Sequence, residues 1–368
     1  MDRTGVLRRP AARPGRIDLN AEFYATESSA LFLHPTFGTG AELAQTGKNG
    51  PSIFPTSSLA LRARLAQEPW YFQAAAFDGV PGDPDNPRGT HVRFRAGDGA
   101  LLIAEAGRSL AEGGLPGKIS LGAWRYTVRA DDLLDTDAQG NPVKRRDAGV
   151  YLLFDYPAAR WSEARGVNVF WRGGIANADV NQFRRAANFG ITVRGPVASR
   201  PRDAFGIGVA AERNSDKFRQ AMRLAGQPAP SSELSVEVSY RAVVTDWLAI
   251  QPSVQFLRNH GDPALASASV VGVRFEFEGR GPERQVTTED TKDTRKKQIR
   301  LVSLVCLVVR KISPERNALR SPCYRRGCRP FGESAQRCAA SSSLLRASTQ
   351  RVPVGVTSFF QNGACVLR

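Results

Sequence analysis

The sequence lacks long apolar runs, and it has no cysteine before residue 306. No stretch of about 18 consecutive apolar residues occurs, so no conventional transmembrane helix is predicted. Residues 1–16 contain no apolar segment of the kind found in a secretory signal peptide. The five cysteines lie between Cys306 and Cys365 at irregular spacings, which predicts neither a disulfide framework nor a zinc site. A body without cysteine is compatible with export through an oxidising compartment.

The central part of the sequence also lacks net charge. The formal charge is +16, yet residues 17–278 contain 28 basic and 28 acidic side chains. The excess belongs to the ends, with +4 in residues 1–16 and +12 in residues 279–368. Nucleic-acid binding through the basic tail is therefore one hypothesis, although no RNA-binding module accompanies the charge.

The sequence does contain repeated alternation of apolar and polar residues with period two. The pattern is clearest in residues 233–243, 247–257 and 271–277, where one face is apolar and the other polar. The same pattern upstream predicts about a dozen strands in an all-β meander, with residues 131–147 as a polar loop. The predicted strands are residues 17–25, 57–65, 70–77, 91–95, 101–107, 118–128, 150–156, 167–173, 187–194, 204–212, 233–243, 247–257 and 271–277.

Alternation alone fits both a soluble sandwich and a membrane barrel, but other features favour the barrel. Short turns alternate with long polar loops, and aromatic residues lie near the ends of the predicted strands. Charged pairs such as Arg62 and Arg64 recur on the polar faces, where a dry core would not accommodate them but a water-filled lumen would. The predicted fold is an antiparallel transmembrane β-barrel.

Several long segments carry a resemblance to a known family. They are TGKNGPSIFP (46–55), DGVPGDPDNPRGTH (78–91), GDGALLIAEAG (97–107), GKISLGAW (117–124), RGPVASRPRDAFGIGVA (194–210), VSYRAVVTDWLAIQPSVQFLRNHG (238–261) and VGVRFEF (271–277). In this order they resemble the carbohydrate-selective outer-membrane porins of the OprB type, over about residues 17–277. The resemblance implies a barrel of about sixteen strands in the cell outer membrane. It also implies passive diffusion of glucose and other sugars into the periplasm.

The same resemblance implies partners and a division of the chain. Outer-membrane lipid and the barrel-insertion machinery are expected partners, and a trimer of identical barrels is one expected assembly. Residues 1–16 are predicted to be a basic, unstructured start, and residues 17–277 a partial porin barrel. Residues 278–368 are predicted to be a basic, cysteine-containing tail that is disordered or non-native. About a dozen strands fall short of about sixteen, so we expect the signal peptide and the first strands to be missing.

A sugar porin needs no nucleophile, metal or cofactor, and none is predicted. It needs charged, hydroxyl and aromatic groups at a constriction, which exchange hydrogen bonds weakly with sugar hydroxyls. We expect the loop at residues 34–56 to fold inward and narrow the pore. Strand parity and closeness to this loop select the candidate pore-lining residues Arg62, Arg64, Arg93, Arg95, Glu105 and Arg125. The alternative is that these charges only solvate the lumen and pair with one another.

The last predicted strand has a lipid-facing and a water-facing side. Arg274 and Glu276 are expected to face water, and the opposite parity faces lipid. The residues expected to face lipid are Val271, Val273, Phe275 and Phe277. The resemblance implies that Phe277 is the terminal aromatic residue of the folded barrel.

Two further alternatives remain at this point. One is an outer-membrane barrel enzyme, but the three histidines lie in predicted loops or at the boundary of one, and none accompanies a GxSxG-type nucleophile. We therefore predict no enzymatic activity. The other is a truncated porin fragment without function.

Overall fold

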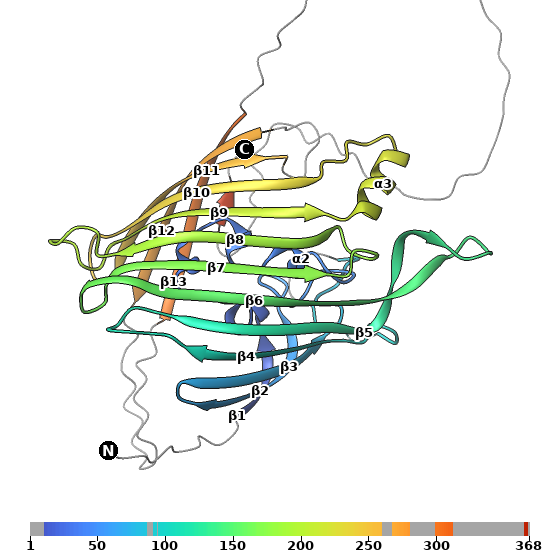
Figure 1. Cartoon of the computed structure of the whole chain (residues 1–368), viewed down its shortest axis with the longest axis horizontal. Coiled ribbons are helices and arrows are strands. Elements are labelled where there is room, and N and C mark those ends of the chain that lie inside the picture. Colours follow the sequence, from blue (N-terminus) through green and yellow to red (C-terminus); the bar gives the residue numbers. More distant parts are fainter. Residues whose placement is uncertain are drawn as a thin grey trace, which may run out of the picture.

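The computed structural model describes residues 11–86, 91–93, 95–259, 267–279, 299–311 and 364–366. In these residues a single sheet contains fourteen strands (Figure 1). The strands are β1 Ala11–Ile17, β2 Ser58–Gln67, β3 Trp70–Asp78, β4 Ala100–Ser109, β5 Lys118–Thr136, β6 Pro142–Ser162, β7 Arg165–Ala176, β8 Phe183–Arg194, β9 Ala204–Asn214, β10 Ser232–Val243, β11 Leu248–Arg258, β12 Ser267–Gly279, β13 Ile299–Lys311 and β14 Ala364–Val366. The helices are α1 Leu19–Glu22, η1 Ser29–Leu31, η2 Pro35–Phe37, α2 Ala41–Ala44 and α3 Asp216–Leu224.

Each strand pairs with its neighbours in sequence. The pairing is antiparallel from β1 to β13, and β14 pairs in parallel with β13. Over the described ranges, no strand pair joins β1 to the other end of the sheet. None of the helices described is long and apolar enough to cross a membrane. The up-and-down order confirms the predicted antiparallel fold of the porin type, and the period-two pattern correctly predicts β2 to β12.

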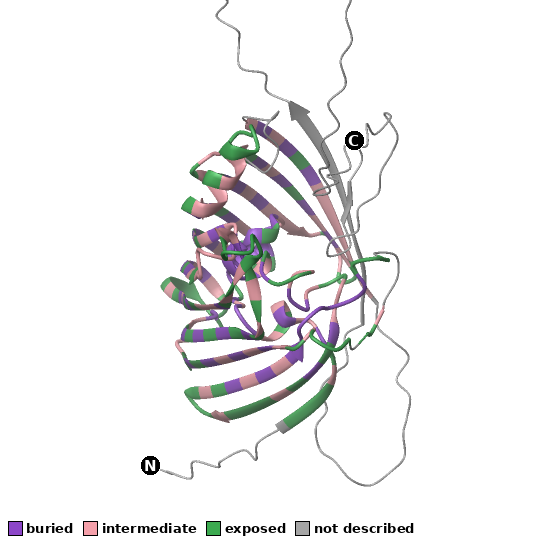
Figure 2. Ribbon diagram, turned by 90° about the vertical axis from the view of Figure 1, so that its right-hand side faces the viewer, coloured by how far each residue is buried: buried purple, intermediate pink, exposed green. Residues whose placement is uncertain are grey.

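The two faces of the sheet have opposite chemistry, as a transmembrane barrel requires. Large apolar side chains are exposed on the convex face, among them Leu61 and Phe189. On the concave face, polar side chains alternate with them along the same strands and are buried (Figure 2). In β10, for example, Ser235, Glu237 and Ser239 are buried on the inner side.

Residues 18–57, here called the inward segment, connect β1 to β2 and lie against the concave face (Figures 1 and 2). The apolar side chains of the inward segment form the core of the molecule with the sheet. One cluster contains Leu19, Phe23 and Leu43 together with Leu101 and Leu153 of the strands. The predicted inward folding of residues 34–56 is confirmed, and the segment that folds inward is longer than predicted.

The two rims of the sheet carry different connections. The turns β2–β3 and β6–β7 contain only residues 68–69 and 163–164, which places both at a short-turn rim. The inward segment, the described residues between β3 and β4 and the connection that contains α3 all lie at the opposite, long-loop rim. Exposed tryptophans mark the short-turn rim, where an interfacial aromatic belt would place them. They are Trp70, Trp161 and Trp247.

Some sequence predictions are wrong at the start of the chain. Residues 17–25 do not form a strand, because the Asp18 side chain accepts a hydrogen bond from the Asn20 backbone N–H and begins α1. Residues 11–16, predicted to be unstructured, belong to β1 and pair with β2. Residues 1–10 lie outside the described residues.

Three later predictions also need correction. The described residues between 91 and 95 are not part of a strand. Residues 131–147 are not a loop throughout, because β5 and β6 extend into them as a long hairpin. The tail contributes β13, which pairs with β12, and β14. The other tail residues predicted to be disordered, 280–298, 312–363 and 367–368, lie outside the described residues.

Phe189 lies near the middle of β8 on the exposed apolar face and is 49% exposed. Its position allows a prediction about stability. Replacing it by arginine (Phe189→Arg) puts a charge into lipid, and we expect a loss of about 2–4 kcal/mol in the free energy of unfolding. Urea unfolding of the chain inserted in lipid vesicles measures this loss. Phe189→Leu is the control and should remain close to the parent. Equal stability of the arginine variant would contradict contact between this face and lipid.

Candidate functional site

Buried polar side chains from successive strands hold the inward segment on the concave face. They are Asp155 of β6, Arg172 of β7, Asn188 of β8, Glu212 of β9, Glu237 of β10 and Gln251 of β11. Each is an inward-facing residue of its strand, so strand parity directs all of them to the same place. The inward segment has little regular secondary structure, and its peptide groups need partners that these side chains supply.

Glu237 binds two consecutive backbone N–H groups of the inward segment. Its Oε1 accepts a hydrogen bond from the Leu33 N–H at 2.7 Å, and its Oε2 accepts one from the His34 N–H at 2.8 Å. Ser239 and Ser253 donate to the same carboxylate at 2.6 and 3.0 Å. Because hydrogen bonds to a carboxylate are stronger than neutral ones, Glu237 fixes this part of the segment firmly.

Arg172 binds the carbonyl groups of the same segment and is fully buried. Its Nη1 donates to the Phe37 carbonyl at 2.5 Å and to Ser29 Oγ at 2.6 Å, and its Nη2 donates to the Thr36 carbonyl at 3.1 Å. The guanidinium also lies 5.1 Å from the centre of the Tyr24 ring, within cation–π range. Arg172 and Glu237 therefore satisfy opposite ends of the peptide groups around residues 33–37.

Two more carboxylates complete this attachment. Asp155 accepts hydrogen bonds from the Ser28 N–H at 3.0 Å and from Ser28 Oγ at 2.6 Å. Glu212 accepts one from Thr36 Oγ1 at 2.6 Å. The inward segment is thus held at a fixed position across the concave face.

Glu105 of β4 is the centre of a second polar network and is 1% exposed. Its Oε1 accepts hydrogen bonds from the Tyr71 hydroxyl at 2.7 Å and from Gln73 Nε2 at 3.3 Å. Its Oε2 accepts from the Tyr151 hydroxyl at 2.8 Å and from the Tyr24 N–H at 3.1 Å. The carboxylate therefore links β3, β4 and β6 to the inward segment.

Basic side chains surround Tyr71 on the same inner face. The Arg64 guanidinium lies 4.8 Å from the Tyr71 ring centre, and the Lys118 ammonium lies 5.6 Å from it. Lys118 Nζ also donates to the Tyr71 hydroxyl at 3.2 Å and is 3.4 Å from Glu105 Oε1. We call Arg64, Tyr71, Glu105 and Lys118 the tyrosine cluster. It combines hydrogen-bond donors, an acceptor and an aromatic ring on the inner face.

The structure brings together three of the six candidate pore-lining residues. Arg62 Nη2 is 2.8 Å from Glu22 and donates to Gln73 Oε1 at 2.9 Å, and Gln73 in turn donates to Glu105. Arg62, Arg64 and Glu105 therefore belong to one connected inner-face group.

The other three candidates lie elsewhere. Arg93 and Arg95 belong to the connection between β3 and β4, where Arg93 pairs with Asp83 and Arg95 pairs with Asp83 and Asp85. Arg125 is exposed on the outer face, because Trp124 and Tyr126 on either side of it are buried inside. The prediction that Arg125 faces the lumen is wrong, since these aromatic side chains fix the inward parity of β5.

The side chains of the last predicted strand, β12, divide between the two faces of the sheet, and contact of its outer side with lipid stays a prediction. Val271 and Phe277 are 50% and 40% exposed on the outer face, and Val273 and Phe275 share their parity and are partly exposed. Arg274 faces inward, where it donates to Gln251 Oε1 at 2.5 Å and pairs with Glu276. A polar pocket of about 330 Å³ at the short-turn rim includes Arg241, Arg274 and Glu276.

The sequence reasoning missed the residues that hold the inward segment. Arg172 is a single charge in the otherwise apolar and glycine-rich stretch VFWRGG, and that isolation is a signal that could have identified it. Asp155 gives a similar signal in LLFDY. A charge at an inward position of an apolar strand needs a buried partner, which here is the inward segment.

Glu42 of α2 is a buried acid within this arrangement. Its Oε1 accepts a hydrogen bond from the Tyr24 hydroxyl at 2.8 Å, whereas its Oε2 has no hydrogen-bond partner among the described residues. Burial raises the pKa of Glu42 to about 7; the Tyr24 hydrogen bond and the Arg172 charge oppose this, and the Glu212 charge adds to it. Burial also raises the pKa of Tyr24, which keeps its hydroxyl protonated as the donor.

In the described part of the chain, no group of three or more His, Cys, Asp or Glu side chains is placed to hold a metal ion. The inner face instead presents hydrogen-bonding, charged and aromatic side chains.

Comparison with known proteins agrees with this arrangement. The model of the carbohydrate-selective porin family OprB matches residues 9–278. Porin B of Pseudomonas aeruginosa is 27% identical over 263 residues, which cover 63% of this chain and 58% of Porin B. The chain therefore spans less than two thirds of the length of that relative. The high-pH structure of Pseudomonas putida OprB shares the fold with a TM-score of 0.61 at 22% identity, covering 72% of this chain and 68% of that one.

The raised pKa of Glu42 predicts a pH dependence of the inward segment. Between the ordinary value of 4.5 and about 7, the folded protein keeps a proton that the unfolded chain has lost. The attachment of the segment is therefore strongest below this window and weakens as the pH rises through it. We expect faster hydrogen exchange of residues 18–57 at pH 8 than at pH 5, after correction for the intrinsic exchange rate. The variant Glu42→Gln stays neutral and should lose this difference.

Glu68→Gln, in the short β2–β3 turn, is the matched control and should keep the pH dependence of the parent. If the parent protein shows the same corrected exchange at both pH values, Glu42 does not control the attachment.

Proposed function

Because the chain belongs to the carbohydrate-selective porin family OprB, we propose that it is an outer-membrane porin through which glucose and other sugars diffuse passively into the periplasm. The family is one of channels, and diffusion through a channel requires no catalytic group. The sheet supplies an apolar outer face for lipid and a polar inner face for water and solute.

The tyrosine cluster is the observation that carries this proposal. Arg64 and Lys118 present charged donors, and Tyr71 presents an aromatic ring between them. A sugar offers hydroxyl groups that donate and accept hydrogen bonds, together with C–H groups that can contact an aromatic ring. Exchange among these partners keeps each binding step weak enough for release, which conduction requires.

The inward segment sets the width of the path. Asp155, Arg172 and Glu237 attach its backbone from three different strands, so the constriction exists before the sugar arrives. A preset constriction avoids an ordering cost for each passing molecule. Selectivity for sugars then comes from the groups that line the constriction and from its size.

The proposed location also implies the partners of the chain. Outer-membrane lipid covers the exposed apolar face, and the barrel-insertion machinery recognises β12 near Phe277. We propose that three identical barrels assemble as a trimer.

A permeation assay tests the role of the tyrosine cluster. In proteoliposomes that contain the full chain, Arg64→Gln removes one charged donor that faces the interior. We expect the swelling rate in glucose, relative to a zwitterionic amino acid of similar size, to fall by about fivefold, the equivalent of one hydrogen bond. Arg125→Gln is the matched control, because its side chain lies on the outer face, and it should leave the ratio unchanged. An unchanged ratio in Arg64→Gln would remove the tyrosine cluster from the sugar path.

A further inference from the structure

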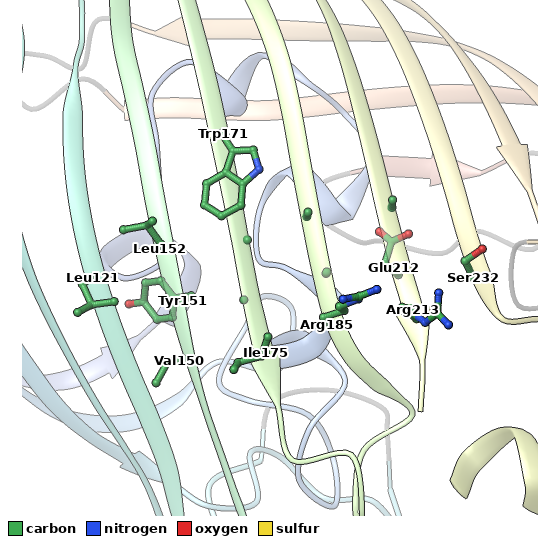
Figure 3. A pocket seen from close by; sticks show the side chains of 15 residues that line it. Leu121, Val150, Tyr151, Leu152, Trp171, Ile175, Arg185, Glu212, Arg213 and Ser232 are labelled. Carbon is green, nitrogen blue, oxygen red and sulfur yellow. The ribbon is translucent and has the colours of Figure 1, made fainter. Parts of the chain in front are cut away.

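An apolar pocket of about 520 Å³ lies on the outer face of the sheet and is not part of the sugar path. Figure 3 shows that its side chains come from successive strands, with Leu121 and Leu152 at one end and Arg185 and Arg213 toward the other. Its volume is within the range of about 300–1,000 Å³ typical of small-molecule sites.

The strand register explains why the outer face of the sheet has a depression here. Gly173, Ala187 and Ala211 are direct neighbours across β7, β8 and β9, and they form the floor of the pocket. The next row toward the middle of the sheet contains large side chains, which are Trp171, Phe189 and Val209. The row toward the long-loop rim contains Ile175, Arg185 and Arg213. A row of small residues between two rows of large ones leaves an apolar depression.

Two arginines occupy neighbouring positions on adjacent strands at the rim side of the pocket. Arg185 and Arg213 are directly opposite each other on β8 and β9, and both have outward parity. Like charges at such positions repel each other. Neither guanidinium group has a hydrogen-bond or ion-pair partner among the described residues. Nearby Arg184, in contrast, pairs with Asp216 at 3.4 Å.

A second pair of arginines repeats this arrangement farther out at the same rim. Arg129 and Arg146 are opposite each other on β5 and β6, and both are exposed. Two like-charge pairs toward the same rim create a local positive potential. A bound anion would offset that repulsion, and arginine forms paired hydrogen bonds with phosphate oxygens.

We propose that the pocket binds an anionic phospholipid, with one acyl chain on the floor formed by Gly173, Ala187 and Ala211 and the phosphate between Arg185 and Arg213. The arginines lie toward the rim, where headgroups are found, and the apolar floor lies toward the middle of the membrane. This order matches the head-to-tail polarity of a lipid. A second copy of the chain would instead have to cover the two arginines with carboxylates.

Native mass spectrometry of the full chain in detergent tests this proposal. The probes are dioleoyl-phosphatidylglycerol, which carries a phosphate anion, and dioleoyl-phosphatidylcholine, which has the same chains and no net charge. We expect the parent to retain the anionic lipid preferentially. Arg185→Gln and Arg213→Gln should each reduce that retention by about fivefold and leave phosphatidylcholine unchanged. Ala187→Leu fills the floor and should reduce retention of both lipids.

Arg108→Gln is the matched control, because Arg108 is exposed on the outer face at the opposite rim, and it should retain the lipid as the parent does. Heat-modifiable migration in electrophoresis confirms that each variant is folded. Equal retention of phosphatidylglycerol by the parent and by both folded arginine variants would overturn the proposal. A stable oligomer without bound lipid that Ala187→Leu dissociates would also overturn it, and would identify the pocket as a subunit interface.

Discussion

The structure depends on the mutual satisfaction of two sets of polar groups that neither water nor secondary structure satisfies. The inward segment has peptide groups without partners in a helix or sheet, and the concave face has charges that are buried beneath it. Glu237 accepts from the N–H groups at residues 33 and 34, while Arg172 donates to the carbonyl groups at 36 and 37. Removing either side leaves the other buried and unpaired, which costs more than the bond itself contributes.

This constraint also restricts which residues can occupy the inward positions of the strands. The inner face must carry charges where the segment passes and very small residues where it approaches most closely. At Gly174, an added Cβ would lie 2.0 Å from Glu42 Oε1, so any side chain there would force the Glu42 carboxyl group to move. At Gly208, the corresponding distance to the Phe37 ring is 2.7 Å. The outer face is free of these demands and presents mainly apolar side chains to lipid.

The sequence was sufficient to predict the parts of this structure that local geometry dictates. Period-two alternation follows from the strand itself, so β2 to β12 and the sidedness of Arg274 and Phe277 could be predicted. The attachment of the inward segment could not, because Ser28 and Asp155 are 127 residues apart in sequence. The side of Arg125 was predicted wrongly because strand parity was assigned with Arg125 inward, whereas Trp124 and Tyr126 occupy the inward positions. Near a rim, the outer face also accepts arginine.

The consecutive glycines of β7 show how both faces constrain the same stretch of chain. Gly173 points outward and forms part of the floor of the lipid pocket, while Gly174 points inward and makes room for Glu42. Alternate residues of a strand face opposite sides of the sheet. At this pair of glycines, neither face of the sheet therefore carries a side chain, and only the backbone separates the two sides. A larger side chain at the first position would fill the outer pocket, and one at the second would displace the Glu42 carboxyl group of the inward segment. Gly173 therefore keeps the outer pocket open, and Gly174 leaves room for the inward segment on the other face. Each glycine is needed at its own position.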